Sequence, residues 1–217
     1  MSISLTLLGT GTPSPLVHRG GSSYLVRLDD QMLLFDCGPA CVRRLLRKGI
    51  CPTKIDTLFL THLHYDHFVD YAYLVLVRWD QSVGKIPDLN VYGPSPAQRV
   101  SDRLFDEDGA FGPDLAARTE HPGSHFIYEM RGGVLPRERP RPRLTEVANG
   151  SQITLAGHHG RGRPCPDAAH VPGVPIRGRR QVHRIRPRHL AHRVADAPGT
   201  RRGRAAAHVP FRQRRSR

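Results

Sequence analysis

The sequence predicts an α/β protein, and three patterns point to this class. Short apolar or alternating runs predict β-strands, and they occupy residues 3–8, 22–28, 32–35, 55–60 and 89–92. Two longer segments between these runs predict helices, at residues 40–48 and 68–79. A dense group of histidine and aspartate residues directly follows the fourth run. Strands alternating with helices are typical of α/β folds.

The first predicted strand leads into a loop rich in glycine and proline, residues 9–15. Gly9 and Gly11 permit a positive φ or a close backbone approach, and two prolines fix the exit of the loop. We interpret the loop as a turn rather than a phosphate cradle, because no helix begins directly after it.

The next two strands, 22–28 and 32–35, read as a hairpin closed by a turn at residues 29–31. Asp36 follows, at a position where an aspartate often caps a helix. The predicted helix 40–48 has one apolar face and ends at Gly49. Its other face is basic, and we interpret it as a solvated surface formed by Arg43, Arg44, Arg47 and Lys48.

The segment after the fourth strand has the pattern H-x-H-x-D-H. Side chains alternate along a strand, so His62 and His64 point the same way at its end. Asp66 and His67 follow on the turn beyond. Imidazoles and carboxylates are donors that Zn²⁺ prefers, and burying so many titratable groups without a cation is costly. The pattern therefore predicts a metal site formed by His62, His64, Asp66 and His67.

Residues 68–155 predict fewer features. The helix at 68–79 is apolar enough to pack on the sheet, and a further helix is expected at 96–105. Residues 106–143 are rich in glycine and proline, and we expect a long irregular excursion that covers the mouth of the site. An Asn-Gly pair inside residues 144–155 predicts a hairpin.

Charge divides the chain into two parts. Residues 1–157 contain 17 basic and 17 acidic residues, whereas residues 158–217 contain 16 arginines and two acidic residues, so the net charge of +14 belongs to the second part. We predict a domain at 1–157 and a disordered Arg/Pro/His-rich tail at 158–217, which has too few apolar residues for a core.

The tail also has the composition of a GC-rich gene translated out of frame, because Arg, Ala, Gly and Pro have GC-rich codons. Shifting by one base allows Val182–Leu190 to be re-translated as an apolar run that ends in Pro-Asp-Thr. We therefore hypothesise a frameshift near His158. The alternative is a genuine basic tail that binds nucleic acid through phosphate contacts.

Cysteine usage and hydropathy predict the compartment. The four cysteines form no C-x-x-C pair, which indicates reduced thiols and a cytoplasmic protein. The apolar run at 3–8 is too short for a signal peptide, and no segment approaches membrane-spanning length, so no membrane partner is expected.

The residues at 61–67, together with Gly9–Pro15 and Asp36–Gly38, resemble the metallo-β-lactamase superfamily, in particular its ribonuclease Z-like members. The resemblance covers residues 3 to about 155 and implies an αββα sandwich whose first half is well specified. It also implies that Asp36 supports the metal loop from behind. The loop of Gly9, Thr10 and Gly11 would border the mouth of the site.

The resemblance further implies two metal ions, one bound by His62 and His64 and a second bound by Asp66 and His67. Three more ligands are not placed in this chain, so one or two zinc ions are expected and the second site is incomplete. Asp66 would be the catalytic residue, which orients the attacking hydroxide and passes a proton to the leaving group.

The expected function is hydrolysis of a phosphodiester or ester by a metal-activated hydroxide. The substrate is a small molecule or a phosphodiester, with nucleic acid a candidate, and a homodimer is left open. Two alternatives remain: a nucleic-acid-binding protein acting through its tail, and a non-functional truncated fragment.

Overall fold

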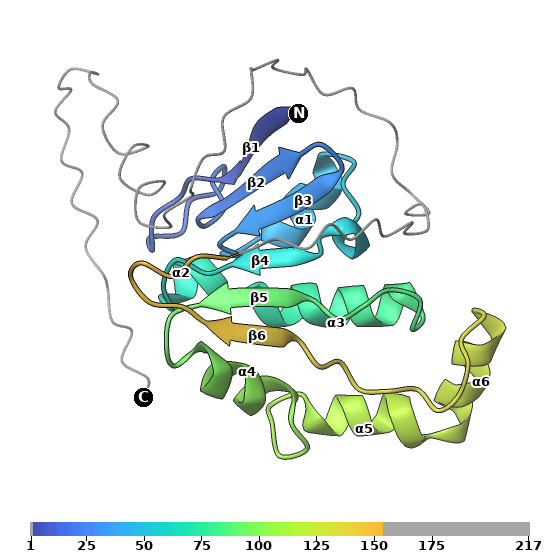
Figure 1. Cartoon of the computed structure of the whole chain (residues 1–217). Coiled ribbons are helices and arrows are strands. Elements are labelled where there is room, and N and C mark those ends of the chain that lie inside the picture. Colours follow the sequence, from blue (N-terminus) through green and yellow to red (C-terminus); the bar gives the residue numbers. More distant parts are fainter. Residues whose placement is uncertain (1, 154–217) are drawn as a thin grey trace, which may run out of the picture. The chain divides into compact units, whose positions relative to one another are not determined.

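A computed structural model of the chain describes residues 2–153. The predicted boundary at residue 157 and the tail at 158–217 lie outside these residues. The described part contains one six-stranded sheet with the order β1-β2-β3-β4-β5-β6 (Figure 1). Its strands are β1 (Ile3–Gly9), β2 (Ser23–Leu28), β3 (Gln31–Phe35), β4 (Thr57–Phe59), β5 (Asn90–Gly93) and β6 (Arg143–Glu146).

The first three strands are antiparallel and the last three extend the sheet in parallel. The predicted hairpin is confirmed, with Val26 opposite Leu33 in the β2–β3 register. Parallel pairing requires crossover connections. Helix α1 (Cys41–Arg47) lies between β3 and β4, and helix α3 (Tyr71–Ser82) lies between β4 and β5.

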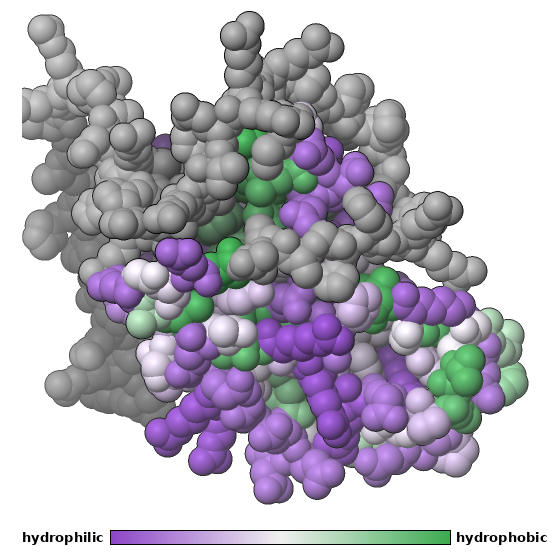
Figure 2. Space-filling view, viewed as in Figure 1, coloured by the Kyte–Doolittle hydropathy of each residue, from purple (hydrophilic) through white to green (hydrophobic). Residues whose placement is uncertain are grey.

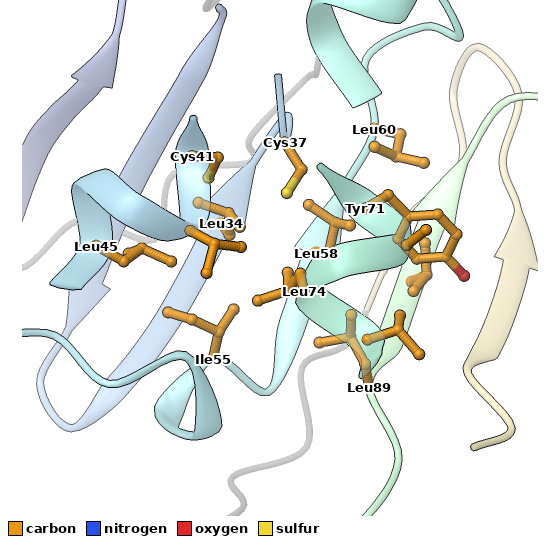
Figure 3. Packing of buried hydrophobic residues seen from close by; sticks show 14 of the residues in the cluster. Leu34, Cys37, Cys41, Leu45, Ile55, Leu58, Leu60, Tyr71, Leu74 and Leu89 are labelled. Carbon is orange, nitrogen blue, oxygen red and sulfur yellow. The ribbon is translucent and has the colours of Figure 1, made fainter. Parts of the chain in front are cut away.

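Helices α1 and α3 cover one face of the sheet and enclose the main core (Figure 3). Leu34 and Leu58 project from neighbouring strands and are fully buried together with Leu45 of α1 and Leu74 of α3. Burial of each such side chain contributes about 1.5–3 kcal/mol. This packing fixes the ends of β3 and β4, from which the candidate site is built.

The other face of the sheet is also apolar. Phe35, Phe59 and Tyr92 stack across three strands, with ring centroids 4.8 and 5.1 Å apart, and Val26 and Leu33 are buried beside them. Two apolar faces on one sheet are the pattern of a sandwich. The chain accordingly has the α/β architecture expected, and residues 2–153 contain one sheet of the predicted sandwich.

The second half of the polar cluster lies in a helical turn, whereas His62 and His64 precede it. Residues 65–68 form the one-turn helix α2 (Tyr65–Phe68), and α3 begins at Tyr71. The helix predicted at 68–79 is therefore broken near Val69. Asp66 and His67 belong to α2, whose backbone hydrogen bonds hold them.

The expectation of an irregular excursion at residues 106–143 is wrong. The helix expected at 96–105 is confirmed as α4 (Ala97–Phe105). Within the segment expected to be irregular, two helices form: α5 (Gly112–Glu120) and α6 (Pro122–Met130). Prolines in the first turns of α5 and α6 start these helices, since proline is pre-organised there. In Figure 1, α6 lies at the end of the molecule far from α2, so it does not cover the cluster. Figure 2 shows hydrophobic residues at this end and a hydrophilic band over β6.

The predicted hairpin at 144–155 is only partly testable. Its first strand forms as β6, but β6 pairs in parallel with β5, and residues 147–153 contain no second strand. Residues 154 and 155 lie outside the described part. No helix within residues 2–153 is both long and apolar enough to cross a membrane.

Candidate metal centre

The four predicted ligands come together beyond the end of β4. The ring centroids of His62 and His64 lie 4.6 Å apart, and those of His62 and His67 lie 4.0 Å apart. The Nε2 atom of His67 lies 3.5 Å from Oδ2 of Asp66. The sequence separation of two between His62 and His64 thus brings both rings to one side of the chain.

Asp66 is the most buried member of the cluster, with 4% of its surface exposed. Its Oδ1 atom is buried and has no hydrogen-bond partner among residues 2–153. An unsatisfied buried acceptor costs about 1–3 kcal/mol, and more when it is charged. A cation beside the carboxylate would offset that cost.

A second carboxylate, Asp36, holds the cluster from behind. It is 1% exposed and adopts a positive φ of 58° directly after β3. Its carboxylate accepts hydrogen bonds from the Thr61 backbone N–H at 2.8 Å and the Thr61 hydroxyl at 2.9 Å. The Nδ1 atom of His67 lies 2.7 Å from its Oδ2. Asp36 therefore contacts His67, the last residue of the H-x-H-x-D-H segment, and Thr61, the residue directly before its first histidine.

These contacts determine which imidazole nitrogens are free. His67 donates its Nδ1–H to Asp36, which leaves the lone pair on Nε2, the atom that faces Asp66. The Thr61 hydroxyl has one proton and gives it to Asp36, so its oxygen accepts from Nδ1 of His62 at 3.0 Å. Both rings thus keep Nε2 available, the arrangement in which a carboxylate fixes the tautomer of a metal ligand.

The pKa values of two histidines move in opposite directions. Burial and the neighbouring His67 lower the pKa of His62, which favours its neutral, ligating form. Burial by itself would lower the pKa of His67, but the hydrogen bond and charge of Asp36 outweigh burial and raise it. Protonation of His67 therefore competes with any cation in mild acid.

Backbone hydrogen bonds join α2 to the segments next to β2 and β3. The N–H of Ser22 donates to the Asp66 carbonyl at 3.1 Å, and the N–H of Cys37 donates to the His67 carbonyl at 2.6 Å. A Cβ atom on Gly21 or Gly38 would collide with the Asp66 carbonyl oxygen. Glycine is needed at both positions because the two backbones touch.

The glycine loop predicted to border the site lies beside this assembly. The Gly11 N–H donates to the Gly20 carbonyl at 2.8 Å, next to Gly21. The hydroxyl of Tyr65 in α2 donates to the Pro13 carbonyl at 2.9 Å. The loop carrying Gly9, Thr10 and Gly11 is thus tied to the helix carrying Asp66. Its role at a substrate mouth stays a prediction.

The donor set fits a metal ion by its chemistry and by the unpartnered oxygen of Asp66. The rings nevertheless lie against one another, and among residues 2–153 no group of three or more His, Cys, Asp or Glu side chains has the geometry of a metal site. The three further ligands implied by the family resemblance are not placed among residues 2–153. The assignment of His62, His64, Asp66 and His67 as ligands stays a prediction.

Sequence reasoning missed the part played by Thr61. Its hydroxyl connects Asp36 to His62, so a single carboxylate reaches two imidazoles. The available signal was a hydroxyl residue directly before the first histidine, at the point where the strand ends.

The fold and this cluster define an α/β protein with a histidine- and aspartate-rich site at a strand end, and comparison with known proteins identifies the family. Residues 16–182 match the model of the metallo-beta-lactamase superfamily. The chain belongs to this superfamily, whose members typically bind metal ions.

Curated relatives narrow the similarity further. The chain is 38% identical over 139 residues to ribonuclease Z of Mycobacterium sp. (strain KMS), covering 61% of this chain and 47% of that protein. It is 33% identical over 177 residues to ribonuclease Z of Mycobacterium bovis, covering 71% and 62%. The chain spans about half the length of the curated relatives that it matches.

Among solved structures, human short-form tRNase Z is 32% identical, with a TM-score of 0.42, covering 46% of this chain and 37% of that chain.

Proposed function

We propose that this chain is a metal-dependent hydrolase that cleaves phosphodiester bonds in RNA. One observation carries the proposal: three imidazoles and the buried Asp66, with its unpartnered Oδ1, meet at one place and are oriented by Asp36. The ribonuclease Z relatives support RNA as the substrate.

His62, His64, Asp66 and His67 would hold the metal, and zinc suits this donor set. When bound, such an ion lowers the pKa of a water molecule to near neutrality and polarises a phosphoryl oxygen. The ion is the source of the electrophilic chemistry, so the side chains of the chain have only to position groups and move protons.

Asp66 has the most direct proposed role. Its Oδ1 is buried and unpartnered, so it can accept a hydrogen bond from the attacking water and keep that water in line with the phosphorus. The carboxylate would take the proton that the water loses as its oxygen bonds to phosphorus, and would pass that proton to the leaving oxygen as the P–O bond breaks. Asp36 and Thr61 act through the histidines by fixing the ring orientation.

The compartment proposed is the cytoplasm. Cys37, Cys41 and Cys51 are free and buried, and reduced thiols of this kind are common where the redox potential is low.

The test combines metal analysis with turnover. Zinc per chain is measured by mass spectrometry, and hydrolysis is followed with bis(p-nitrophenyl) phosphate and with an RNA carrying a 3′ extension. We expect the Asp66→Asn variant to lose about 10²–10⁴-fold in turnover. A matched control is His121→Gln, in a histidine at the start of α6 that lies outside the cluster.

Three outcomes would count against the proposal. Equal turnover in wild type and Asp66→Asn would exclude the catalytic role of Asp66. Hydrolysis of carboxylic esters without hydrolysis of either phosphodiester would reject the substrate class. Wild-type protein with neither zinc nor turnover would favour a non-functional fragment.

A further inference from the structure

The structure places an unpaired basic surface next to the candidate metal centre. Residues 1–54 contain seven basic and three acidic residues, whereas residues 55–157 contain ten basic and 14 acidic residues. Residues 1–157 are neutral as a whole, but an excess of positive charge lies in residues 1–54, which carry the glycine loop and α1.

Helix α1 contributes most of this surface. Arg43, Arg47 and Lys48 are exposed, and the helix has no acidic residue in its first turn. Arg19, in the loop before β2, is also exposed. Arg43 interacts electrostatically with Asp70, but within residues 2–153 none of these four side chains is in an ion pair of the kind that the arginines of the α5–α6 region form. By contrast, Arg118, Arg131, Arg137 and Arg139 are all in ion pairs. We call Arg19, Arg43, Arg47 and Lys48 the basic surface.

The spacing of the positive charges in α1 destabilises the helix slightly. Arg43 and Arg47 are four residues apart, as are Arg44 and Lys48. Like charges at this spacing destabilise a helix by about 0.2–0.5 kcal/mol per pair. The helix dipole favours cations in the last turn, but it does not remove repulsion between them. A bound polyanion would remove this repulsion by neutralising the charges.

Arg44, which lies in α1 between the exposed cations, links this helix to the loop that contacts α2. The Arg44 guanidinium donates to the His18 carbonyl at 3.0 Å and lies against Gly20. The next residue, Gly21, touches the Asp66 carbonyl. Arg44 therefore holds the loop at residues 18–21, whose Gly21 contacts α2, and the exposed Arg43 is its neighbour in α1.

We propose that the basic surface binds the phosphates of an RNA strand and guides it to the candidate metal centre. Side chains four residues apart on a helix are about 5–6 Å apart at Cβ, so this row is longer than one phosphate and suits successive phosphates of a strand. The proposal rests on the proposed function for the direction of the strand, but binding itself does not depend on catalysis.

The test uses the full chain with three charges removed: Arg43→Gln, Arg47→Gln and Lys48→Gln. Arg44 is left in place because it contacts the loop. The matched control removes the same charges elsewhere: Lys85→Gln, Arg99→Gln and Arg103→Gln, all exposed residues. Circular dichroism and thermal melting verify the fold of both variants.

Binding of a fluorescein-labelled single-stranded RNA is measured by anisotropy in EDTA over a series of KCl concentrations. Each phosphate contact on a single strand contributes about −0.7 to the slope of log K against log salt. We expect the slope of the α1 variant to be shallower by about 2, and that of the control to match wild type. The arginine-rich tail contributes equally to all three proteins. Equal slopes in all three would overturn the proposal.

A second readout locates the RNA directly. RNA containing 4-thiouridine is cross-linked to the wild-type chain, and the modified peptides are identified by mass spectrometry. Cross-links within residues 41–54 support the proposal, and cross-links confined to residues 158–217 would overturn it in favour of the tail. Binding to vesicles of phosphatidylcholine and phosphatidylglycerol is measured for the same variants. If the α1 variant binds RNA like wild type but no longer binds these vesicles, the basic surface belongs to a membrane contact and the proposal is overturned.

Turnover separates this inference from the proposed function. The α1 variant should hydrolyse bis(p-nitrophenyl) phosphate like wild type, while its KM for RNA rises and its kcat is unchanged. If wild type hydrolyses no phosphodiester but the difference in salt slope is found, the proposed function fails and the basic surface stands. If wild type hydrolyses a phosphodiester but the salt slopes of the α1 variant and wild type are equal, the proposed function stands and the basic surface fails.

Discussion

Asp36 shows how one side chain can organise a site that it does not itself enter. Its carboxylate contacts Thr61 and His67, and through Thr61 it reaches His62. The positive φ of Asp36, 58°, is uncommon for a residue other than glycine. Strain of this kind persists where surrounding contacts fix it, and three hydrogen bonds do so here.

The Asp36–His67 pair predicts a pH dependence of stability in the metal-free protein. The pKa of His67 is raised above its ordinary value of 6.5, so the folded state binds the proton more tightly than the unfolded state. The stabilisation is fully present below pH 6.5 and is lost as pH rises through the folded pKa. Urea unfolding in EDTA at a series of pH values measures this, and histidine NMR gives the pKa directly.

In the Asp36→Asn variant the loss of stability with rising pH should disappear, because the carboxylate that raises the pKa of His67 is absent. Zinc affinity should fall about 10–100-fold because the orientation of His67 is lost. Thr61→Ser is the control, since it keeps the hydroxyl. A His67 pKa below 6.5 in the wild-type chain would contradict the prediction.

At the scale of elements, Asp80 near the end of α3 attaches the α5–α6 pair to the sheet layer. It forms ion pairs with Arg131 at 3.2 Å and Arg137 at 2.9 Å, and lies 3.5 Å from Arg118 of α5. The Arg137 guanidinium also lies 3.9 Å from the centroid of the Trp79 ring. One carboxylate therefore holds three segments that are distant in sequence.

Acid should release this attachment. Burial by itself would raise the pKa of Asp80, but Arg137 and Arg131 outweigh burial and hold it below the ordinary value of 3.8. The stabilisation is present above pH 3.8 and is lost as pH falls through the folded pKa. Because Trp79 is the single tryptophan, its fluorescence reports the change.

Asp80→Asn should destabilise the protein by about 1.5–3 kcal/mol at neutral pH, the range for hydrogen bonds to charged groups, and should reduce the acid sensitivity. Asp114→Asn, in an exposed i,i+4 pair with Arg118, should change stability by less than about 1 kcal/mol. Equal effects of the two substitutions would show that Asp80 has no special role.

At the scale of the molecule, the described residues form a sheet with an apolar side facing α1 and α3 and a second apolar side around Phe35 and Phe59. Residues 158–217 contain one Phe and one Leu, so their composition is poorly suited to bury a large apolar face. This mismatch is the physical reason to retain the frameshift as a proposal.

Sequencing the gene around the codon for His158 tests that proposal. We expect an inserted or deleted base there, and the restored frame should encode apolar strands and further His and Asp residues. A protein expressed from the restored frame should bind about two zinc ions per chain. An uninterrupted frame that encodes the same arginine-rich tail in close relatives would reject the frameshift.

Strands and helices with a strong periodicity could be predicted from local sequence. The β2–β3 hairpin, α1 and the position of the H-x-H-x-D-H segment follow from local pattern, because alternation and helical spacing are properties of neighbouring residues. The helices α5 and α6 did not follow, because glycine and proline in residues 106–143 resemble loop signals although the prolines start helices.

Contacts between residues far apart in the chain could not be predicted in this way. The contact of Asp36 with Thr61 and His67, the closeness of Gly38 to Asp66, and the place of Arg44 beside the glycine loop each join segments far apart in the chain. Parallel pairing of β3 with β4 brings the ends of the two strands to the same edge. That register is set by the packing of α1 and α3 on the sheet, which local sequence does not encode.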